Sequence, residues 1–145
     1  MTILTAVIDG NPLPAQRTRS ARGRHYNTDT YDTELNRLAA EFRMAWGVIE
    51  PLQGDVMMRV VWYRQTNHPV DIDNLGKALQ DAAVRAGVMG DDRQIKAAPP
   101  LLEVDRNNPR LVVGFYTADT AEYKEYRRRQ LLWAMTIRNA VIQEP

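Results

Sequence analysis

Residues 56–87 read VMMRVVWYRQTNHPVDIDNLGKALQDAAVRAG, and this stretch decides the fold. Its first eight residues are mostly β-branched, aromatic or otherwise apolar, which predicts a strand within residues 53–65. The segment NLGKALQDAAVRAG predicts a helix, because Asp73 or Asn74 can cap its start and Gly87 stands where a left-handed residue would end it. The centre of the chain is therefore a strand followed by a helix.

The segments before this unit predict a strand, a loop and a helix. Residues 2–9 are β-branched and apolar enough for a strand, whereas residues 12–30 hold two prolines, many arginines and no periodicity, which indicates a loop. From Asp32 onward apolar residues recur at helical spacing, and this helix is expected to stop near Gly47. The apolar positions are Leu35, Leu38, Ala39, Phe42 and Trp46.

The segments after the central unit predict two strands and a long helix. Residues 101–105 and 111–117 are typical of strands, joined as a hairpin by residues 106–110, and residues 120–142 form a long helical stretch. The predicted order is β-α-β-α-β-β-α. This order indicates an α+β (mixed α/β) fold, a single domain in which helices flank a mixed sheet.

Length and composition fit one globular domain. The chain has 145 residues, 44% of them hydrophobic and 26% charged. We expect residues 1–118 to form the domain, and residues 119–145 to form a C-terminal helical extension packed on it or at a dimer interface. The absence of cysteine excludes disulfides, thiolate metal sites and cysteine nucleophiles. With no long apolar run and no signal-peptide pattern, we expect a cytoplasmic protein without a membrane partner.

Charge is distributed unevenly, although the net charge is only +1. One basic cluster lies at residues 17–25 and another at residues 124–129, while acidic groups of interest lie between them at residues 71–92. Basic surface around an acidic site suits an enzyme that cuts phosphodiesters, because such an enzyme must hold both a polyanion and cations. The alternative is that these arginines form an ordinary solvated face.

The acidic segment predicts a cation site. Asp71 and Asp73 stand two residues apart in a stretch that we expect to be extended, so both carboxylates would project on one side. Asp91 and Asp92 follow after a short connection that could return the chain to the first pair. Hard divalent cations such as Mg²⁺ prefer such oxygen ligands. Simple N-capping of the helix by Asp71 or its neighbours is the alternative.

Lys77 lies one helical turn after Asp73 and one turn before Asp81. A lysine there could orient a carboxylate, neutralise a phosphate or stabilise developing charge on a scissile group. An exposed ion-pair ladder at i, i+4 spacing is the alternative. We interpret His68 as a surface histidine, and the context of Glu103 and Asp105 fits solvent exposure.

Residues 71–95, DIDNLGKALQDAAVRAGVMGDDRQI, resemble the signature of the RusA family of Holliday-junction resolvases. Several spaced polar positions carry the resemblance together. They are Asp71, Asp73, Asn74, Lys77, Asp81, Asp91, Asp92 and Gln94. A weaker likeness covers roughly residues 3–117, including a Pro-rich, basic N-terminal loop.

The resemblance implies a homodimeric crossover junction endodeoxyribonuclease that makes paired symmetric cuts in four-way junction DNA during recombination and repair. It implies Mg²⁺ as cofactor, for which Mn²⁺ can substitute, and a bacterial, prophage or phage setting. By position, Asp71, Asp73 and Asp92 match the family's metal-binding and catalytic carboxylates. Lys77 matches its catalytic lysine, and Asp91 is a further candidate ligand.

The chain departs from the family just before Asp71, where residues 67–70 read NHPV in place of a basic tract. We therefore expect the basic N-terminal cluster to contact DNA instead. Its candidate residues are Arg17, Arg19, Arg22 and Arg24. The alternatives are a nuclease for other branched or flapped DNA, a nucleotide phosphohydrolase, and a catalytically silent DNA-binding protein. A pure binder gains nothing from acidic groups that face phosphates.

Overall fold

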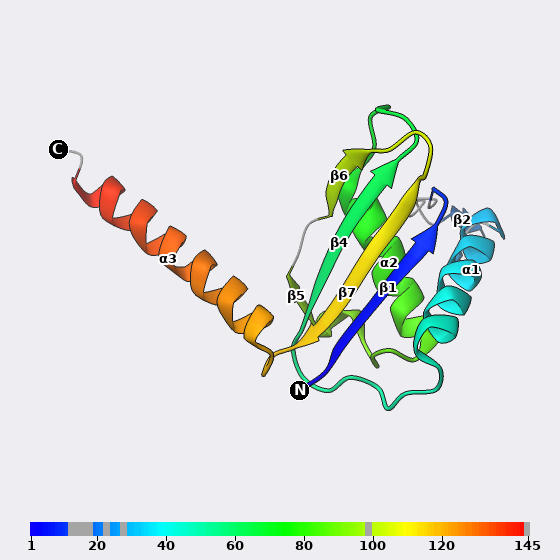
Figure 1. Cartoon of the computed structure of the whole chain (residues 1–145), viewed down its shortest axis with the longest axis horizontal. Coiled ribbons are helices and arrows are strands. Elements are labelled where there is room, and N and C mark those ends of the chain that lie inside the picture. The colour runs from blue at the N-terminus through cyan, green and yellow to red at the C-terminus, as the bar shows by residue number, and fades with distance from the viewer. Residues whose placement is uncertain (12–18, 22–23, 27–28, 98–99, 144–145) are drawn as a thin grey trace.

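The computed structural model describes residues 1–11, 19–21, 24–26, 29–97 and 100–143. A five-stranded mixed sheet has two helices on one face, and a third helix leads away from it (Figure 1). The predicted α+β class, single domain and order of the main elements are confirmed. The strands of the sheet are β1 (Ile3–Asp9), β4 (Val56–Arg64), β5 (Ile95–Ala97), β6 (Leu101–Val104) and β7 (Arg110–Thr117).

Strand β4 lies at the centre of the sheet. On one edge it pairs antiparallel with β7, which pairs antiparallel with β1. On its other edge β4 pairs parallel with two short strands, β5 beside its start at Val56 and β6 beside its end at Arg64. The nine residues of β4 therefore pair with every other strand of this sheet except β1.

The predicted hairpin of the two late strands is wrong, because β4 lies between them. Strand β6 pairs with one edge of β4 and β7 with the other, so the connecting loop crosses the end of β4. Crossing two strand spacings needs about 10 Å, which five residues span easily. The Asp105 carboxylate accepts hydrogen bonds from the Arg110 guanidinium at 2.8 Å and the Asn108 amide at 3.2 Å, which holds this loop.

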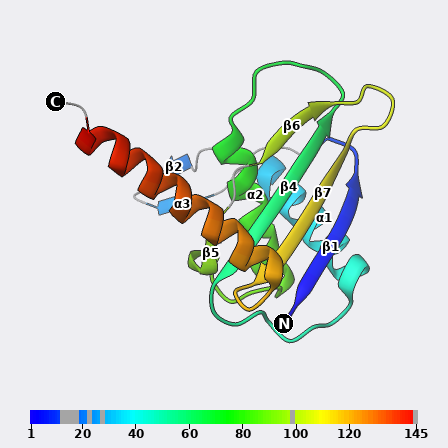
Figure 2. The same cartoon turned by 60° about the vertical axis from the view of Figure 1, so that its left-hand side comes forward.

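Helices α1 (Asp29–Trp46) and α2 (Ile72–Ala86) cover one face of the sheet (Figures 1 and 2). The apolar stripe predicted for α1 is buried from Leu35 to Phe42. It packs with Leu75 and Leu79 of α2 and with the inward residues of the strands, such as Phe115. Each buried large side chain contributes about 1.5–3 kcal/mol, and together these contacts define one core between helices and sheet.

The predicted loop at residues 12–30 is wrong in part. Strands β2 (Arg19–Ala21) and β3 (Arg24–Tyr26) form a separate antiparallel pair, in which Ser20 lies opposite His25. Three-residue strands are too short to show alternation, so proline content and missing periodicity dominated the prediction. Residues 12–18 lie outside the described residues.

The long C-terminal helix predicted by the sequence is α3 (Ala121–Gln143). Only its first turns meet the sheet, where Tyr123 is buried. The rest of α3 leads away from the domain in both views (Figures 1 and 2). No helix in the described part of the chain is both long and apolar enough to span a bilayer.

Candidate active site

Asp71 ends the loop after β4 and begins α2. It is the N-cap residue, and one carboxylate oxygen accepts hydrogen bonds from the amides of Asp73 at 3.0 Å and Asn74 at 3.2 Å. Its other oxygen accepts from the side-chain amide of Asn74 at 3.0 Å. The cap is thus Asp71, one of the alternatives that the sequence left open, and not Asp73 or Asn74. The helix ends as predicted at Gly87, whose φ is +80°.

Asp73 lies inside the first turn of α2 and not in an extended stretch. The expectation that Asp71 and Asp73 share one extended stretch is therefore wrong, because the helix begins at Ile72, between them. Both acids nevertheless lie at the helix N-terminus. The exposed N–H groups there favour negative charge.

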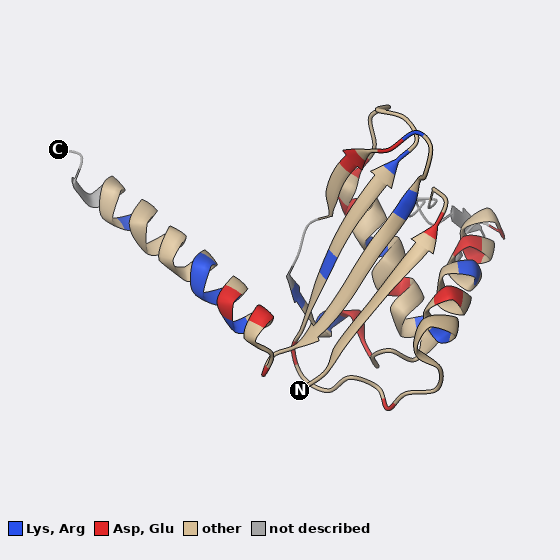
Figure 3. Ribbon diagram, in the orientation of Figure 1, with Lys and Arg blue, Asp and Glu red and all other residues tan. Residues whose placement is uncertain are grey.

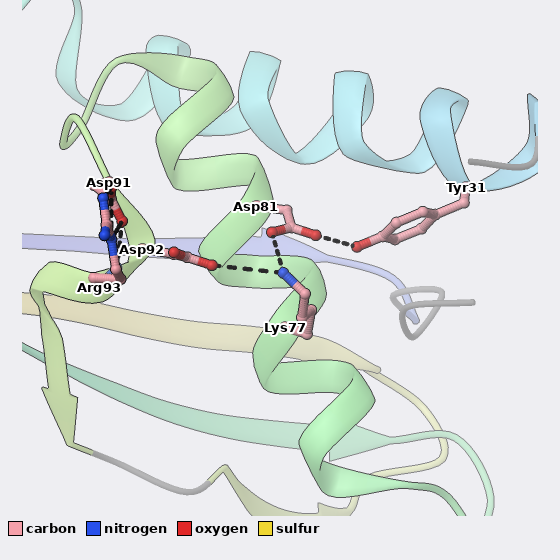
Figure 4. Close-up of polar contacts among 6 residues, drawn as sticks. All are labelled: Tyr31, Lys77, Asp81, Asp91, Asp92 and Arg93. Carbon is pink, nitrogen blue, oxygen red and sulfur yellow. Dashed lines mark hydrogen bonds and ion pairs between the residues drawn. The ribbon is translucent and has the colours of Figure 1, made fainter. Parts of the chain in front are cut away.

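Lys77 lies between two carboxylates (Figure 4). Its ammonium nitrogen is 2.7 Å from Asp81 Oδ1, one turn along α2, and 3.5 Å from Asp92 Oδ2. The second oxygen of Asp81 accepts a hydrogen bond from the Tyr31 hydroxyl of α1 at 2.8 Å. The hydrogen bond to Asp81 raises the pKa of Lys77, so the ammonium stays protonated. Of the Asp73–Lys77–Asp81 ladder that the sequence indicated, the Lys77–Asp81 pair is present, and the second partner of Lys77 is Asp92 in place of Asp73.

Asp91 and Asp92 point in different directions, as expected for neighbouring residues. Asp91 caps the 3₁₀ helix η1 (Asp92–Gln94), and its carboxylate accepts hydrogen bonds from both the amide and the guanidinium of Arg93. This contact with Arg93 holds the pKa of Asp91 well below its usual range. Asp92 instead faces Lys77 at 3.5 Å, a longer contact than the 2.6 Å between Asp91 and Arg93, so Asp92 is the less tightly paired of the two carboxylates.

One amide side chain holds the Asp91–Asp92 turn against the sheet. The Gln94 side-chain oxygen accepts from the backbone amides of Gly90 and Asp91, and its nitrogen donates to the carbonyls of Leu52 and Gly54. All four distances lie between 2.8 and 3.2 Å. This capping box places Asp92 beside α2.

A shallow open hollow lies between α1, α2 and the acidic turn. Three carboxylates and one guanidinium line it together with apolar side chains. The lining residues are Leu35, Asp81, Val84, Arg85, Gly90, Asp91 and Asp92. Arg85 also donates to Asp32 and Asn36, which ties this end of α2 to α1. The hollow is thus acidic and accessible, which suits cations or the groups that they bind.

The acids at the start of α2 and the acid of η1 have donor atoms that fit Mg²⁺. Asp71, Asp73 and Asp92 offer only carboxylate oxygens, and Mg²⁺ usually takes one or two carboxylates together with waters and substrate phosphate. Among the described residues no group of three histidine, cysteine or acidic side chains is already gathered for a metal. Lys77 supplies the positive charge next to Asp92.

The family model for Endodeoxyribonuclease RusA matches residues 9–116, more than half of the chain. The chain belongs to the RusA endodeoxyribonuclease family. A search of the curated proteins found no match. The resemblance drawn from residues 71–95 is confirmed, and membership in this family makes the protein a nuclease by class. The RusA match contains α2 and η1 and ends before α3.

The RusA-matched region also contains His68, Glu103 and Asp105, which the sequence analysis placed at the surface. The carbonyl of His68 accepts a hydrogen bond from the Arg64 guanidinium, while the residue itself is exposed. Glu103 is exposed on β6, and Asp105 is paired with Arg110, which lowers its pKa. We assign these residues no part in the candidate active site.

The predicted DNA-binding arginines are described only in part. Arg19 begins β2 opposite Tyr26 and Arg24 begins β3 opposite Ala21, so the two arginines lie at opposite ends of this short strand pair. Arg17 and Arg22 lie outside the described residues. Their role in binding DNA stays a prediction.

Two residues of the site escaped the sequence reasoning, and a third was noticed without a role. Tyr31 is 50 positions from Asp81, and a pattern of neighbouring residues cannot indicate a contact over that separation. The contact of Arg93 with Asp91 was not predicted, although the two residues are only two positions apart and their side chains can meet at that separation. Gln94 belongs to a D-x-x-Q capping pattern that the sequence does display.

Proposed function

We propose that this RusA-family protein is a Mg²⁺-dependent, structure-specific endonuclease that resolves four-way DNA junctions. A homodimer would make paired symmetric cuts, one by each subunit, in DNA recombination and repair. The observation that carries the proposal is the contact of Lys77 with both Asp81 and Asp92, inside the family-matched region. Lys77 contacts an acid of its own helix and an acid of η1, so the contact joins two separate segments of the family match and not only neighbouring turns of one helix.

In this proposal, Asp71, Asp73 and Asp92 would hold Mg²⁺, and Asp91 is a further candidate. When bound, Mg²⁺ would supply Lewis-acid activation of water and neutralisation of charge at the scissile phosphate. Mn²⁺ can substitute, because the same hard oxygen ligands suit it.

Lys77 acts on the DNA. Its ammonium group is kept protonated by Asp81 and would neutralise charge on the phosphate or on the departing 3′ oxygen. Water attacks phosphorus while the bond from phosphorus to the 3′ oxygen breaks, which yields a 5′-phosphate and a 3′-hydroxyl. Asp81 is a positioning residue. It orients Lys77 and is itself oriented by the Tyr31 hydroxyl.

The decisive experiment incubates the purified protein with labelled four-way junction, flap and linear duplex, in Mg²⁺ or EDTA. We expect symmetric cutting of the junction alone, abolished by EDTA and by Asp73→Asn. Cutting of flaps at an equal rate would favour a nuclease for other branched DNA. Binding without cutting of any substrate would favour a silent DNA-binding protein.

A second variant separates catalysis from binding. Lys77→Ala should bind junction DNA nearly as well as the unsubstituted protein and cleave it at least about tenfold more slowly, a difference of about 1.4 kcal/mol in activation free energy. The matched control is Lys96→Ala, whose ammonium lies near Asp55 at 3.9 Å. If binding by Lys77→Ala fell as far as cleavage, Lys77 would be a binding residue only.

A further inference from the structure

An open hollow lies at the end of β4, where two loops meet. One wall is the connection from β4 to α2 at residues 65–68, and the other is Arg106 in the loop from β6 to β7. Residues 65–70 contain no lysine, arginine, aspartate or glutamate (Figure 3). Among the described lining residues, Arg106 therefore carries the one permanent charge, and no carboxylate opposes it.

Arg106 differs from the other charged residues of its loop because they pair with each other. Asp105 and Arg110 form an ion pair at 2.8 Å, and the Arg110 guanidinium also lies over the Tyr63 ring, 3.9 Å from its centroid. Arg106 is exposed and makes no ion pair or hydrogen bond within the described part of the chain. A guanidinium has five N–H donors, so Arg106 is available to an anion from outside.

Both walls of the hollow are held in place. Arg64 is only 7% exposed, and its guanidinium donates a hydrogen bond to the His68 carbonyl, which fixes the first wall. The Arg64 carbonyl accepts a hydrogen bond from the Asp105 amide at 2.8 Å, which ties the second wall to the end of β4. The backbone around the hollow is thus set before a ligand arrives, so binding there orders little additional chain.

The groups that line the hollow suit a phosphate. The planar guanidinium of Arg106 matches the geometry of phosphate oxygens, and the wall at residues 66–68 adds a hydroxyl, an amide and an imidazole that can donate hydrogen bonds. The hollow between α1 and α2 has the opposite character, because three carboxylates line it. One hollow therefore suits cations, and the other suits the phosphate backbone of a nucleic acid.

The hollow is close in sequence to the acid that begins α2. Three peptide steps separate His68 from Asp71, so their Cα atoms are at most about 11 Å apart. One strand of duplex DNA advances about 3.4 Å along its axis for each phosphate. A strand with one phosphate at Asp71 would therefore bring another to the hollow about three steps away or fewer.

We propose that Arg106 and the wall at residues 65–68 bind a backbone phosphate of the cut strand, within about three nucleotides of the scissile phosphate. The inference rests on the proposed function for its substrate, which is DNA. Arg106 is a positioning residue, because a phosphate contact sets the register of the strand over the acids and takes no part in bond breaking. A loop of the sheet thus supplies the positive charge that residues 67–70 lack.

Binding of four-way junction DNA in EDTA, where nothing is cut, tests the contact. Arg106→Ala should raise Kd about three- to tenfold and make the dependence of log K on log salt less steep by about 0.9, the value for one phosphate. Arg106→Lys keeps the charge and should keep the salt slope. The matched control is Arg138→Ala, because Arg138 is also exposed and without a partner in the described chain.

A neutral phosphate locates the contact. Junctions are prepared with a single methylphosphonate at successive positions around the branch, and binding of the unsubstituted protein is compared with binding of Arg106→Ala. At the phosphate that Arg106 contacts, the neutral linkage should remove most of the difference between the two proteins, since each change deletes the same interaction. We expect this position within about three nucleotides of the cut.

Three outcomes would overturn the inference. A Kd and a salt slope equal to those of Arg138→Ala would mean that Arg106 is an ordinary solvated arginine. Additive effects at every methylphosphonate would mean that Arg106 acts only through the general field of the protein. A lower melting temperature in both Arg106→Ala and Arg106→Lys, with equal loss of binding, would mean that the residue supports the fold.

The binding measurements also separate this inference from the proposed function. Coupling between Arg106 and one phosphate, in a protein that cuts no DNA in Mg²⁺, would refute the proposed function alone. Junction cutting without coupling at any phosphate would refute the role of Arg106 alone.

Discussion

Helices α2 and α3 differ in the packing contacts that fix their positions. The 15-residue α2 buries one side against α1 and the sheet, and it presents charge on the other. The 23-residue α3 has no such division beyond its first turns, and its apolar half faces solvent. The helix with a single apolar stripe is oriented by its own chain. The helix without one stays exposed beyond its first turns.

This difference in packing also decides which helix can hold the side chains of a catalytic site. Lys77 and Asp81 occupy the exposed side of α2, where a packed opposite side holds the backbone still enough to set short distances. Glu125 of α3 makes comparable ion pairs with Arg128 and Arg129, but these lie on a helix that the domain does not hold. A precise site therefore belongs on α2.

Deleting buried volume should have the largest effect. Leu79→Ala on α2 removes a fully buried side chain and is expected to lower the free energy of unfolding by about 2–5 kcal/mol. Leu132→Ala on α3 should change it by less than about 0.5 kcal/mol at concentrations where the protein is monomeric. Urea denaturation measures both. Equal losses at such concentrations would mean that α3 packs within the monomer.

Removing a charge from the acidic turn should affect catalysis and not stability. Asp92→Asn keeps the shape of the side chain, and we expect cleavage of junction DNA to slow by about 10²-fold or more, since metal ions contribute several kcal/mol. Asp55→Asn, an exposed acid beside Lys96, is the matched control. Single-turnover cleavage rates distinguish them. A rate for Asp92→Asn within twofold of the control would remove Asp92 from the site.

Two substitutions of Asp71 separate its cap from a metal role. Asp71→Ala removes the hydrogen bonds to the first turn of α2 and should lower the free energy of unfolding by about 1 kcal/mol. Asp71→Asn retains an N-cap, so stability should be nearly unchanged while cleavage falls. Thermal unfolding and cleavage are measured on both variants. Full activity in Asp71→Asn would leave capping as the only role of this acid.

The smallest effect concerns the charges of α3. Hydrogen bonds from Arg128 and Arg129 lower the pKa of Glu125 to about 2. A lowered carboxyl pKa stabilises the folded helix at pH values above the ordinary glutamate range, and this contribution disappears as pH falls toward 2. Nuclear magnetic resonance of the Glu125 carboxyl carbon should show little titration between pH 6 and 4. Titration in the ordinary range would mean that these exposed pairs do not persist in solution.

Local patterns predicted the elements that packing supports along their whole length. The spacing from Leu35 to Phe42 marked α1, and Gly87 marked the end of α2, because each rule depends only on neighbouring residues. The placement of β6 could not be predicted in the same way. Which edge of β4 it joins depends on partners about 40 positions away, Val61 to Arg64, and a polar loop permits either a hairpin or a crossing.

The acids of the site were predicted by residue type and spacing, but their geometry was not. Asp73 was expected in an extended stretch, and the helix instead begins before it, because Asp71 satisfies the first free amides. The contact of Asp92 with Lys77 depends on how the turn after α2 is held, and the contact of Tyr31 with Asp81 depends on the packing of α1. Neither is encoded at short range.

The four hydrogen bonds of Gln94 make position 94 a tuning point for the acidic pair. A carboxamide has two N–H donors and two acceptor positions, and here each one is used. Glutamate would set a negative charge against the carbonyls of Leu52 and Gly54, and leucine would leave both carbonyls and both amides without this partner. A single change at Gln94 would thus shift Asp92 relative to α2 without altering any acid, through a segment some 40 residues earlier in the chain.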